Sequence, residues 1–399
     1  MTHTNIDILI SGGGIAGMAA AISFGAAGFS VICVDPTQPI IARDEQGSDL
    51  RSTALLQPAR NILMTAGVWD RLEPHASPLE IMRIVDAGGE VAEARVTHDF
   101  RSADVSELPF GWNFPNWLLR RELMAAMAAQ PTVDFRPGVA TTSLLTRTNE
   151  ARVGLSDGTR ARAKLVIAAD GRNSPMRNAA QIQVKTKRYG QKALAFAVTH
   201  PIPHENVSTE IHRSGGPFTL VPLPDFKGAP SSAVVWMENG PRANELSELD
   251  VQAFEDAMSQ RSCHLFGPLK LASRRSIWPI ISQQAQRLSG ERLALIAEAA
   301  HVLPPIGAQG LNMSLRDLAC LLDLAQARPD ALGDAQMLDA YHSARHRDIS
   351  LRVQGIDLLN RASQVSAQPL RDARAAGLKA IYGMAPIRKT LMQMGLGVR

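Results

Sequence analysis

The sequence has few cysteines, few aromatic residues and no block of basic residues. Its three cysteines, Cys33, Cys263 and Cys320, lie far apart and form no C-x-x-C pair, so we expect neither a disulfide framework nor a metal site. Aromatic residues make up 5% of the chain, too few for a surface that stacks on bases. A net charge of +4 without a basic block favours an anionic cofactor over a nucleic-acid partner.

A long stretch without charge could indicate a signal peptide or a membrane span. Residues 12–34 carry no charged side chain, but Asp7 rather than Lys or Arg precedes them. Several glycines inside the stretch would also weaken a spanning helix. We therefore expect neither kind of segment there, and the unpaired cysteines are typical of a reducing compartment.

The same stretch instead predicts a strand, a tight turn, a helix and a second strand. An apolar run at 6–11 precedes a G-x-G-x-x-G turn, an Ala-rich segment follows, and an apolar run at 30–34 ends in Asp35. In this βαβ order the glycine spacing indicates a dinucleotide site. The turn residues expected at the dinucleotide are Gly12, Gly14, Ala16 and Gly17.

Each of these positions has a physical role in binding a dinucleotide. Gly12 permits the tight turn, Gly14 lets a pyrophosphate approach the backbone, and Gly17 lets the helix pack closely on the strand. The helix N-terminus offers free N–H groups to the phosphates. Asp35 can accept hydrogen bonds from an adenosine ribose. The unit alone does not distinguish FAD from NAD.

Three further segments carry arginines or acids beside predicted elements. The sequence DLRSTAL at 49–55 contains Arg51, which is either a bidentate phosphate ligand or a solvated loop residue. Arg120 and Arg121 stand at a predicted helix start, where the same two alternatives remain open. A buried strand at 165–169 delivers Asp170 to an Asp-Gly turn.

A fourth segment, AEAAHVLPPIGAQGLNMSLRD at 297–317, combines an acid, a histidine, two prolines and two glycines. It lies between a predicted strand at 293–297 and a predicted helix at 311–324. The glycines let the backbone pass close to a ligand, and the prolines remove freedom that binding would otherwise have to freeze. His301 has no second His or Cys at ligand spacing, so we expect a packed loop residue rather than a metal ligand.

Together these motifs resemble the FAD-dependent aromatic hydroxylases, a family of single-component flavoprotein monooxygenases, and most closely their ubiquinone-biosynthesis branch. The resemblance spans the chain and has four motifs in family order: the glycine turn, the D-x-R-x-x-A-L segment, the Asp-Gly turn and a flavin loop at 298–312. The branch is indicated by the D-x-R-x-x-A-L form, GVW at 67–69, PPIGAQGLNMSLRD and a C-terminal PLRDARAAGLKAI.

The resemblance implies FAD as the cofactor and a role for each matching residue. Arg51 would contact the pyrophosphate, Arg120 would lie beside the cofactor, and Asp170 would link FAD to the reductant site. In the flavin loop, Pro305 would lie near the isoalloxazine face. Leu311 and Asn312 would present backbone N–H groups to flavin N1 and the C2 carbonyl, where a helix N-terminus stabilises negative charge. Gly310 would allow the close approach.

The sequence departs from the family at Ala297 and Glu298, where Gly-Asp is usual and the Asp carboxylate holds the ribityl chain. Glu keeps the charge and the acceptor oxygens but adds a methylene, and Ala adds a methyl group. Glu298 is therefore either a repositioned working acceptor or the mark of weakened FAD binding.

The expected fold is α/β, with a Rossmann-like FAD-binding domain, an inserted antiparallel β-sheet substrate domain and a helical C-terminal tail. The FAD-binding domain would comprise 1–75, 100–180 and 265–345. The substrate domain would comprise 76–99 and 181–264, because alternating, Pro-punctuated segments at 181–265 are typical of antiparallel strands. The helical region would be 346–399, with the helical pattern starting at Tyr341.

The resemblance implies that the protein hydroxylates a phenol, polyprenylated in this branch, with O2 and a C4a-hydroperoxyflavin. Either NAD(P)H or an electron-donating protein would reduce the flavin. No residue is identified as the catalytic base. Two alternatives stay open: an FAD-dependent reductase or dehydrogenase, and a non-catalytic member that binds a quinone precursor or organises partner enzymes.

The C-terminal region is basic and amphipathic, with arginines and lysines scattered among apolar residues. It is either an ordinary helix solvated on one face or a surface for an anionic membrane or a partner enzyme. The expected location is the cytoplasm, with peripheral contact to the inner membrane as the open alternative.

Overall fold

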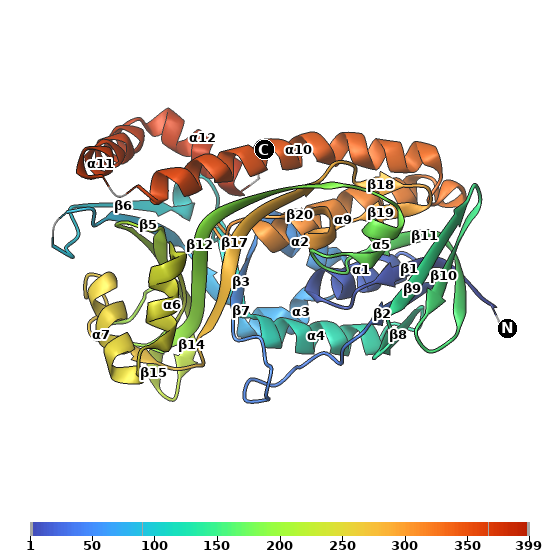
Figure 1. The fold of residues 1–399 in the computed structure, drawn as a ribbon, viewed down its shortest axis with the longest axis horizontal. Coiled ribbons are helices and arrows are strands. Elements are labelled where there is room, and N and C mark those ends of the chain that lie inside the picture. Colours follow the sequence, from blue (N-terminus) through green and yellow to red (C-terminus); the bar gives the residue numbers. More distant parts are fainter. Residues whose placement is uncertain (1–2, 90, 366, 397–399) are drawn as a thin grey trace.

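The computed structural model describes residues 3–89, 91–365 and 367–396. Two large sheets lie side by side, and helices pack on both (Figure 1). The eight-stranded sheet lies in the right half of that view and the nine-stranded sheet in the left half. Helix α10 (Ala335–Ser363) runs along the top. The expected α/β architecture with a helical C-terminal region is confirmed.

The eight-stranded sheet has the order β18-β19-β11-β1-β2-β8, with β10 and β9 continuing antiparallel from β11. Strands β19, β11, β1, β2 and β8 are parallel to one another. Their central residues are buried because helices cover the sheet, as in other parallel sheets. The bounds are β1 (His3–Ser11), β2 (Val31–Asp35), β8 (Val133–Pro137), β9 (Thr141–Arg147), β10 (Glu150–Leu155), β11 (Arg160–Ala168), β18 (Ser289–Gly290) and β19 (Leu293–Leu295).

The helices of this half pack on the sheet and on one another. Helix α1 is buried from Ala16 to Gly25, so its small residues let α4 and α9 approach closely. Helix α4 starts at Asn116, so Arg120 lies in its second turn rather than at its start. The bounds are α1 (Ile15–Ala26), α2 (Gln57–Thr65), α3 (Trp69–Leu72), α4 (Asn116–Ala128), α5 (Pro175–Ala179), α8 (Ala297–Ala300) and α9 (Gln309–Ala327), with short 3₁₀ turns at Glu73–His75, Ser102–Asp104 and Pro329–Ala331.

The nine-stranded sheet has the order β20-β17-β12-β15-β14-β13-β5-β6, with β16 beside β12. Its pairs are antiparallel except for the parallel pair β13 and β5. A separate three-stranded sheet has the order β3-β7-β4, and its strands β4 and β7 contact β14 of the nine-stranded sheet. The bounds are β3 (Ser52–Leu56), β4 (Ser77–Leu79), β5 (Ile81–Asp86), β6 (Val96–Arg101), β7 (Gly111–Pro115), β12 (Val184–Thr199), β13 (Val207–His212), β14 (Pro217–Phe226), β15 (Ala229–Asn239), β16 (Lys270–Leu271), β17 (Ser276–Ala285) and β20 (His301–Val302).

Two helices interrupt the segment that the sequence indicated as strands only. Helices α6 (Gly240–Glu248) and α7 (Val251–Arg261) follow β15 directly. Asn239 accepts a hydrogen bond from the Arg242 N–H, and Asp250 accepts one from the Ala253 N–H. These N-caps satisfy backbone donors at each helix start, a local signal that the alternating pattern concealed.

The two faces of the nine-stranded sheet have different neighbours because side chains alternate along a strand. On β15, Val234 and Trp236 belong to the core under α6 and α7. Val235 and Met237 belong to the opposite face, where Met237 packs with Ile306 of the loop before α9. The outer face therefore carries α6 and α7, and the inner face meets the expected flavin loop.

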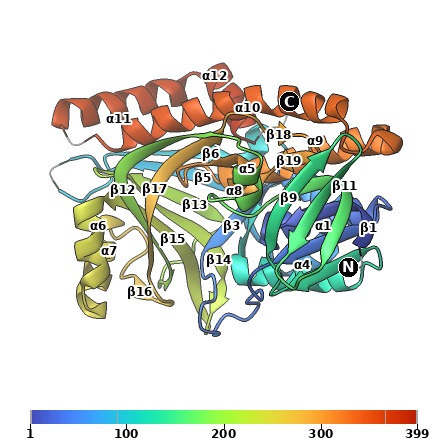
Figure 2. The same ribbon diagram turned by 45° about the vertical axis from the view of Figure 1, so that its right-hand side comes forward.

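The C-terminal helices α10, α11 (Gln368–Gly383) and α12 (Ala385–Leu396) form a layer along the top of the molecule (Figure 2). The helical segment starts at Ala335, six residues before Tyr341, because Asp334 caps it by accepting from the Met337 N–H. Among the described residues, no helix is long and apolar enough to cross a membrane.

Candidate functional site

Three neighbouring parallel strands bring the expected site residues to one edge of the eight-stranded sheet. β1 ends before Gly12, β11 ends before Asp170, and β19 ends before the turn that carries Glu298. β11 pairs with β1 on one side and with β19 on the other. Carboxyl ends of parallel strands share one edge, so segments far apart in sequence meet at a single crevice.

The glycine turn has the close backbone approaches that its spacing predicts. Gly12 has φ +105°, and a Cβ there would lie 2.3 Å from the carbonyl oxygen of Ala169. A Cβ on Gly17 would lie 1.8 Å from the Gly12 carbonyl oxygen. A Cβ on Gly14 would meet no heavy atom within 4 Å, and the buried Ala16 follows in the first turn of α1. Only the Gly14 side of the turn is open to a ligand.

Asp35 holds the end of β2 against this turn. Its Oδ2 accepts a hydrogen bond from the Gly13 N–H at 2.7 Å. Its Oδ1 accepts from the backbone N–H and the hydroxyl of Thr37, at 2.8 and 2.7 Å. A carboxylate has about four acceptor positions, so these three bonds orient Asp35 and leave capacity for a ribose hydroxyl.

Asp170 carries an acceptor without a partner at the same edge. Its Oδ2 accepts from Ser11 Oγ and from the Met176 N–H, both at 3.2 Å. Its Oδ1 is buried and has no hydrogen-bond partner among the described residues. Burial raises the pKa of the Asp170 carboxyl above its ordinary value, against the hydrogen bonds that stabilise the carboxylate. A hydroxyl or N–H donor of a bound cofactor would satisfy this atom.

Asp49 organises the two arginines that the sequence singled out. Arg51 donates from Nε and Nη2 to the two oxygens of Asp49, each at 2.8 Å. Arg120 Nη2 lies 3.5 Å from Asp49 Oδ2, and Asn116 Nδ2 donates to the same oxygen at 3.0 Å. Burial opposes the charge on Asp49, but hydrogen bonds from Arg51 and Asn116 and the charge of Arg120 hold its pKa below the usual range.

Asp49 and Asn116 are members of the site that were not predicted from the sequence. The D-x-R spacing was a usable signal for Asp49, because the bidentate pair joins residues two apart. Arg51 itself remains about half exposed and lies over the ring of Trp278 of β17, 5.4 Å from its centroid. Its guanidinium is thus oriented at the junction of the two large sheets while part of it stays accessible to an anion.

Ala297 has backbone geometry that normally requires glycine. Its φ is +55°, in the left-handed region that costs a residue with a Cβ about 1–2 kcal/mol. β19 therefore ends at Leu295, two residues earlier than the strand expected at 293–297, and the chain turns into α8. This position is the one at which the sequence departs from the family's Gly-Asp.

Glu298 lies on this turn with its side chain half exposed. Its Oε2 is 3.5 Å from Nε of Arg172, which follows the Asp-Gly turn after β11. Its charge is also close enough to Arg51 to raise the pKa of that guanidinium, together with the larger effect of the Asp49 hydrogen bonds. The extra methylene of Glu298 thus leaves the carboxylate between two arginines and at the crevice.

Arg177 supports the Glu298 turn from the buried side. The sequence had not indicated a role for it. It is buried, and its Nη1 donates to the Ala299 carbonyl oxygen at 2.9 Å. Its Nη2 donates to the Arg172 carbonyl oxygen at 2.8 Å. One guanidinium therefore joins the turn after β11 to α8. No spacing rule connects residues 122 positions apart, so only the fold reveals this contact.

The N-terminus of α9 completes the crevice. Pro305 lies half-buried in the loop before the helix, and Ala308 caps α9 with φ +54°. The free N–H groups of a helix start are those of the cap and the first three residues, here through Gly310 and Leu311. A Cβ on Gly310 would meet no heavy atom within 4 Å.

Asn312 stands one position further along α9, where an N–H can bond back to the cap carbonyl. Its side chain links the helix to β3: Oδ1 accepts from the Leu56 N–H at 2.8 Å, and Nδ2 donates to the Ala54 carbonyl oxygen at 2.7 Å. The buried amide thus holds the helix start in place, in addition to the backbone role that the resemblance implies.

His301 is packed, in the short strand β20 rather than in a loop. Its Nε2 lies 2.6 Å from Oδ2 of the buried Asp317, whose Oδ1 accepts from Arg345 Nε at 2.8 Å. Burial would lower the pKa of the Arg345 guanidinium, but the charge and hydrogen bond of Asp317 raise it overall. This network ties the flavin loop to α9 and α10.

The residues fit a dinucleotide that carries a flavin. The glycine turn is open only at Gly14, Asp170 presents an orphan buried acceptor, and the start of α9 offers free N–H groups. Cationic guanidinium groups flank the crevice near Glu298. A pyrophosphate, a ribityl chain and an isoalloxazine ring need these donor, acceptor and charge types.

A sequence profile of the family described as "FAD binding domain" matches residues 5–354. The chain belongs to this FAD-binding family. The ubiquinone hydroxylase UbiL of Rhodospirillum rubrum is 30% identical over 394 residues, which are 98% of this chain and 89% of that protein. The 3-demethoxyubiquinol 3-hydroxylase of Escherichia coli is 26% identical over 100% of both chains.

A solved structure shows the same fold. The p-nitrophenol 4-monooxygenase PnpA of Pseudomonas putida matches with a TM-score of 0.80 at 16% identity, over 98% of each chain. Family membership makes FAD the cofactor for which the crevice is arranged, and it confirms the family resemblance found in the sequence.

Proposed function

We propose that the protein is an FAD-dependent monooxygenase that hydroxylates a polyprenylated phenol in ubiquinone biosynthesis. The main support for the proposal is that the loop before α9, which borders the crevice, packs against an apolar face of the nine-stranded sheet. Ile306, in the loop before α9, packs against Met237 and Ile280 of the nine-stranded sheet. An aromatic ring placed between the loop and the sheet would lie beside the flavin in a largely apolar environment.

The curated relatives support this reaction. Ubiquinone hydroxylase UbiL and 3-demethoxyubiquinol 3-hydroxylase match over almost the whole chain. FAD, when bound, supplies the activation of O2. The chain's own residues would orient the cofactor, exclude water and stabilise negative charge on the flavin through the N-terminus of α9.

The site residues have separable roles in this proposal. Gly12, Gly14 and Gly17 would admit the pyrophosphate, with Ala16 in the first turn of α1 behind them. Asp35 would bind the adenosine ribose, and Arg51 would bind the pyrophosphate while Asp49 orients it. These assignments rest on the open Gly14 side and on the bidentate Arg51–Asp49 pair.

The flavin half of the cofactor would lie against the remaining site residues. Glu298 would accept hydrogen bonds from the ribityl hydroxyls, Asp170 would link FAD to the reductant site, and Arg120 would lie beside the cofactor. Pro305, Gly310, Leu311 and Asn312 would face the isoalloxazine ring. NAD(P)H would be the electron donor. No residue is assigned as catalytic base.

The division into domains follows the same proposal. Residues 1–75, 100–180 and 265–345 would form the FAD-binding domain, and 76–99 with 181–264 the substrate domain. The eight-stranded sheet and the pairing of β5 with both β13 and β6 support it. Strand β17 falls in the third FAD-binding segment but pairs with β12, so it would connect the two domains.

The test is the absorption spectrum of the purified protein with FAD, followed by turnover with NAD(P)H and isotopically labelled O2. A bound-flavin spectrum and labelled oxygen in the phenol product are expected. Flavin reduction without label in the product would favour the reductase or dehydrogenase alternative. A protein that takes up no FAD would favour a non-catalytic role.

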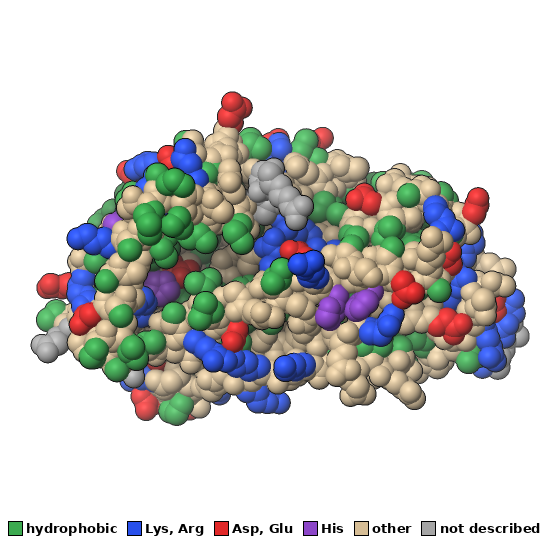
Figure 3. All heavy atoms as spheres, turned by 90° about the horizontal axis from the view of Figure 1, so that it is seen from above, with side chains coloured by type: hydrophobic (Ala, Val, Ile, Leu, Met, Phe, Trp, Pro, Cys, Tyr) green, Lys and Arg blue, Asp and Glu red, His purple; other side chains and the backbone are tan. Residues whose placement is uncertain are grey.

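We also propose that the C-terminal helices contact an anionic membrane, from which a polyprenylated substrate would enter. Figure 3 shows hydrophobic side chains gathered over the end of the molecule that carries α11 and α12, with Lys and Arg among them. Apolar side chains and cations on one surface are typical of interfacial helices. The exposed apolar residues of α10, α11 and α12 include Leu351, Leu358, Leu359, Leu370, Ile387, Leu391 and Met394.

Cosedimentation with vesicles tests this surface. A Leu358→Gln/Leu370→Gln variant should bind vesicles of phosphatidylglycerol less well than the wild type. A control variant, Leu145→Gln/Ile202→Gln, changes two exposed apolar residues elsewhere and should bind normally. Equal binding by all three proteins would contradict membrane contact and favour a partner enzyme as the occupant.

A further inference from the structure

A cavity of about 340 Å³ lies on the outer side of the nine-stranded sheet. β15, α6, α7, α11 and the turn after β13 contribute to its wall. Pockets of about 300–1,000 Å³ are typical of small-molecule sites. Its wall includes Trp236, Glu238, Arg242, Arg261 and Arg371.

The wall of this cavity is strongly cationic. Three of these wall residues are arginines, and one, Glu238, is a carboxylate. Arg242 is compensated in part by Glu245, 3.0 Å away on the exposed side of α6. Glu238 is buried, which raises the pKa of its carboxyl, and it is a single carboxylate facing several guanidinium groups. The cavity therefore favours an anion.

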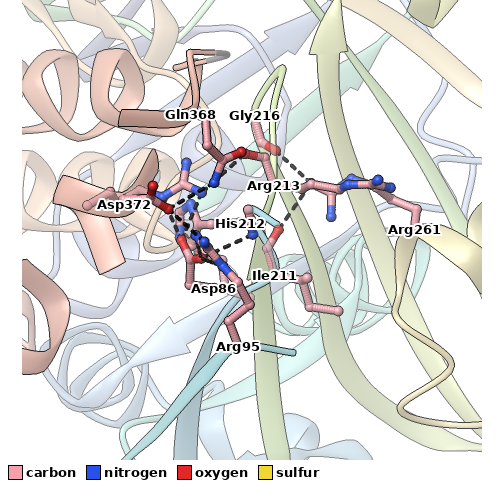
Figure 4. Close-up of polar contacts among 12 residues, drawn as sticks. Asp86, Arg95, Ile211, His212, Arg213, Gly216, Arg261, Gln368 and Asp372 are labelled. Atoms are coloured by element: carbon pink, nitrogen blue, oxygen red, sulfur yellow. Dashed lines mark hydrogen bonds and ion pairs between the residues drawn. The ribbon is translucent and has the colours of Figure 1, made fainter. Parts of the chain in front are cut away.

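Arg261 brings a buried hydrogen-bond donor without an acceptor to the wall. It is 7% exposed, and Nη2 donates to the carbonyl oxygens of Ile211 and Gly216 at 3.1 and 2.8 Å (Figure 4). Its Nη1 has no partner among the described residues. Burial lowers the pKa of this guanidinium to about 10, so it stays charged at neutral pH.

Trp236 adds a second buried donor to the same wall. Its ring is 4% exposed, and its Nε1 has no hydrogen-bond partner within the described part of the chain. Buried donors without acceptors are costly, and a buried charge without a partner costs more. A ligand that supplies several acceptor oxygens and negative charge would remove both costs at once.

We propose that this cavity binds a phosphate-bearing anion, either the head group of an anionic lipid or a soluble phosphate compound. Guanidinium groups match the geometry of phosphate oxygens and bind them with paired hydrogen bonds. Donors come from the sheet, from α7 and from α11, so the ligand would be surrounded by elements that are separate in sequence.

The anion would also strengthen the attachment of the C-terminal helices. Arg374 Nη2 of α11 lies 2.9 Å from Oδ2 of Asp86 at the end of β5. Arg95 donates to Asp86 Oδ1 at 2.7 Å and to Asp372 of α11 at 2.7 Å (Figure 4). Arg371 places one further cation of α11 at the cavity. A shared anion would join this helix to Arg261 of α7.

This site is independent of the FAD crevice. Trp236 and Glu238 alternate along β15 with Val235 and Met237, which belong to the inner face that meets Ile306. The sheet therefore separates the cavity from the flavin loop. A binding measurement on the cavity can succeed or fail regardless of whether the protein hydroxylates a phenol.

Isothermal titration with inorganic pyrophosphate tests the proposal on the full-length protein saturated with FAD, so that the pyrophosphate site of the FAD crevice is already filled. An Arg242→Gln/Arg371→Gln variant should bind pyrophosphate at least about tenfold more weakly than the wild type, since hydrogen bonds to charged groups are lost. The control Arg152→Gln/Arg287→Gln removes the same charge at two exposed sites outside the cavity wall and should bind almost as the wild type does.

A variant that is expected to increase pyrophosphate affinity distinguishes loss of the site from simple misfolding. Glu238→Gln removes the carboxylate from the wall, so pyrophosphate should bind more tightly than to the wild type. Heat denaturation should show that pyrophosphate stabilises the wild type and Glu238→Gln but not the Arg242/Arg371 variant. The amides of α11 should exchange hydrogen more slowly when the anion is bound.

Competition with vesicles distinguishes the two sources of phosphate. If pyrophosphate releases the wild type from phosphatidylglycerol vesicles and the Arg242/Arg371 variant binds them poorly, the lipid head group is the ligand. If pyrophosphate binds in the cavity without affecting vesicle binding, the ligand is soluble. The proposal is overturned if pyrophosphate affinity falls equally in the cavity variant and the control variant. It is also overturned if neither pyrophosphate binding nor vesicle binding depends on Arg242 and Arg371.

Discussion

Glu298 Oε2 lies 3.5 Å from Nε of Arg172, so the carboxylate after β19 is held by the turn after β11. The two turns follow adjacent parallel strands, and Arg177 joins them from the buried side through the Ala299 and Arg172 carbonyls. Glu298, which replaces the family's Asp, is thus held at the crevice by an ion pair with Arg172 and does not point away from the crevice.

We expect Glu298→Gln to weaken FAD binding about tenfold or more, because a hydrogen bond to a charged acceptor contributes about 1.5–3 kcal/mol. Glu298→Asp keeps the charge and should bind FAD as well as or better than the wild type. Titration of flavin fluorescence measures both. Glu291→Gln, at an exposed position before β19, is the matched control and should leave FAD affinity unchanged.

Ala297→Gly should stabilise the protein, in contrast to most Ala→Gly substitutions. At φ +55° glycine removes a strain of about 1–2 kcal/mol and loses about 0.4–1 kcal/mol through the unfolded chain. The net gain is between about 0 and about 1.6 kcal/mol, measurable by urea denaturation. Ala299→Gly, two residues away inside α8, should destabilise instead, and the same sign in both variants would refute the strain argument.

Arg177→Met should destabilise the protein by about 2–4 kcal/mol, because the buried Ala299 carbonyl oxygen and the part-buried Arg172 carbonyl oxygen lose their donor. It should also weaken FAD binding, since the Glu298 turn loses its anchor to the turn after β11. Thermal denaturation and flavin titration measure the two effects. Arg160→Met at the exposed start of β11 is the control. Normal FAD affinity in a destabilised Arg177→Met protein would show that the turn does not need this anchor.

Asp49 should make stability depend on pH in the acid range. Its pKa is held below the usual value in the folded state, so the unfolded chain binds more protons there. The stabilisation is complete above the ordinary Asp pKa of about 3.9 and is lost as the pH falls through the folded pKa. Asp49→Asn should be less stable than the wild type at pH 7, and the difference should shrink below about pH 4.

Denaturation at a series of pH values measures this difference. Asp134→Asn, at an exposed residue of β8, provides the reference for a surface carboxylate. A constant difference between wild type and Asp49→Asn from pH 7 to pH 3 would contradict the linkage. FAD affinity should fall in Asp49→Asn as well, because Arg51 and Arg120 lose the group that orients them.

Short-range patterns in the sequence were enough to predict the local units of the fold. The βαβ unit around Gly12, the end of β2 at Asp35 and the helix after Gly310 follow from short-range patterns of apolar residues and glycine. They were predictable because neighbouring residues decide them. Family membership also followed from motif order, since each motif is short and contiguous.

Tertiary structure decided the features that join distant segments. The contact of Arg177 with Ala299, the ring of Trp278 under Arg51 and the pairing of β17 with β12 all depend on how the sheets pack. The positive φ of Ala297 arises in the same way, because the chain must turn between β19 and α8 whatever residue stands there. Long-range packing can impose a backbone angle or a charge pair that local preference opposes, and no periodicity in the sequence records it.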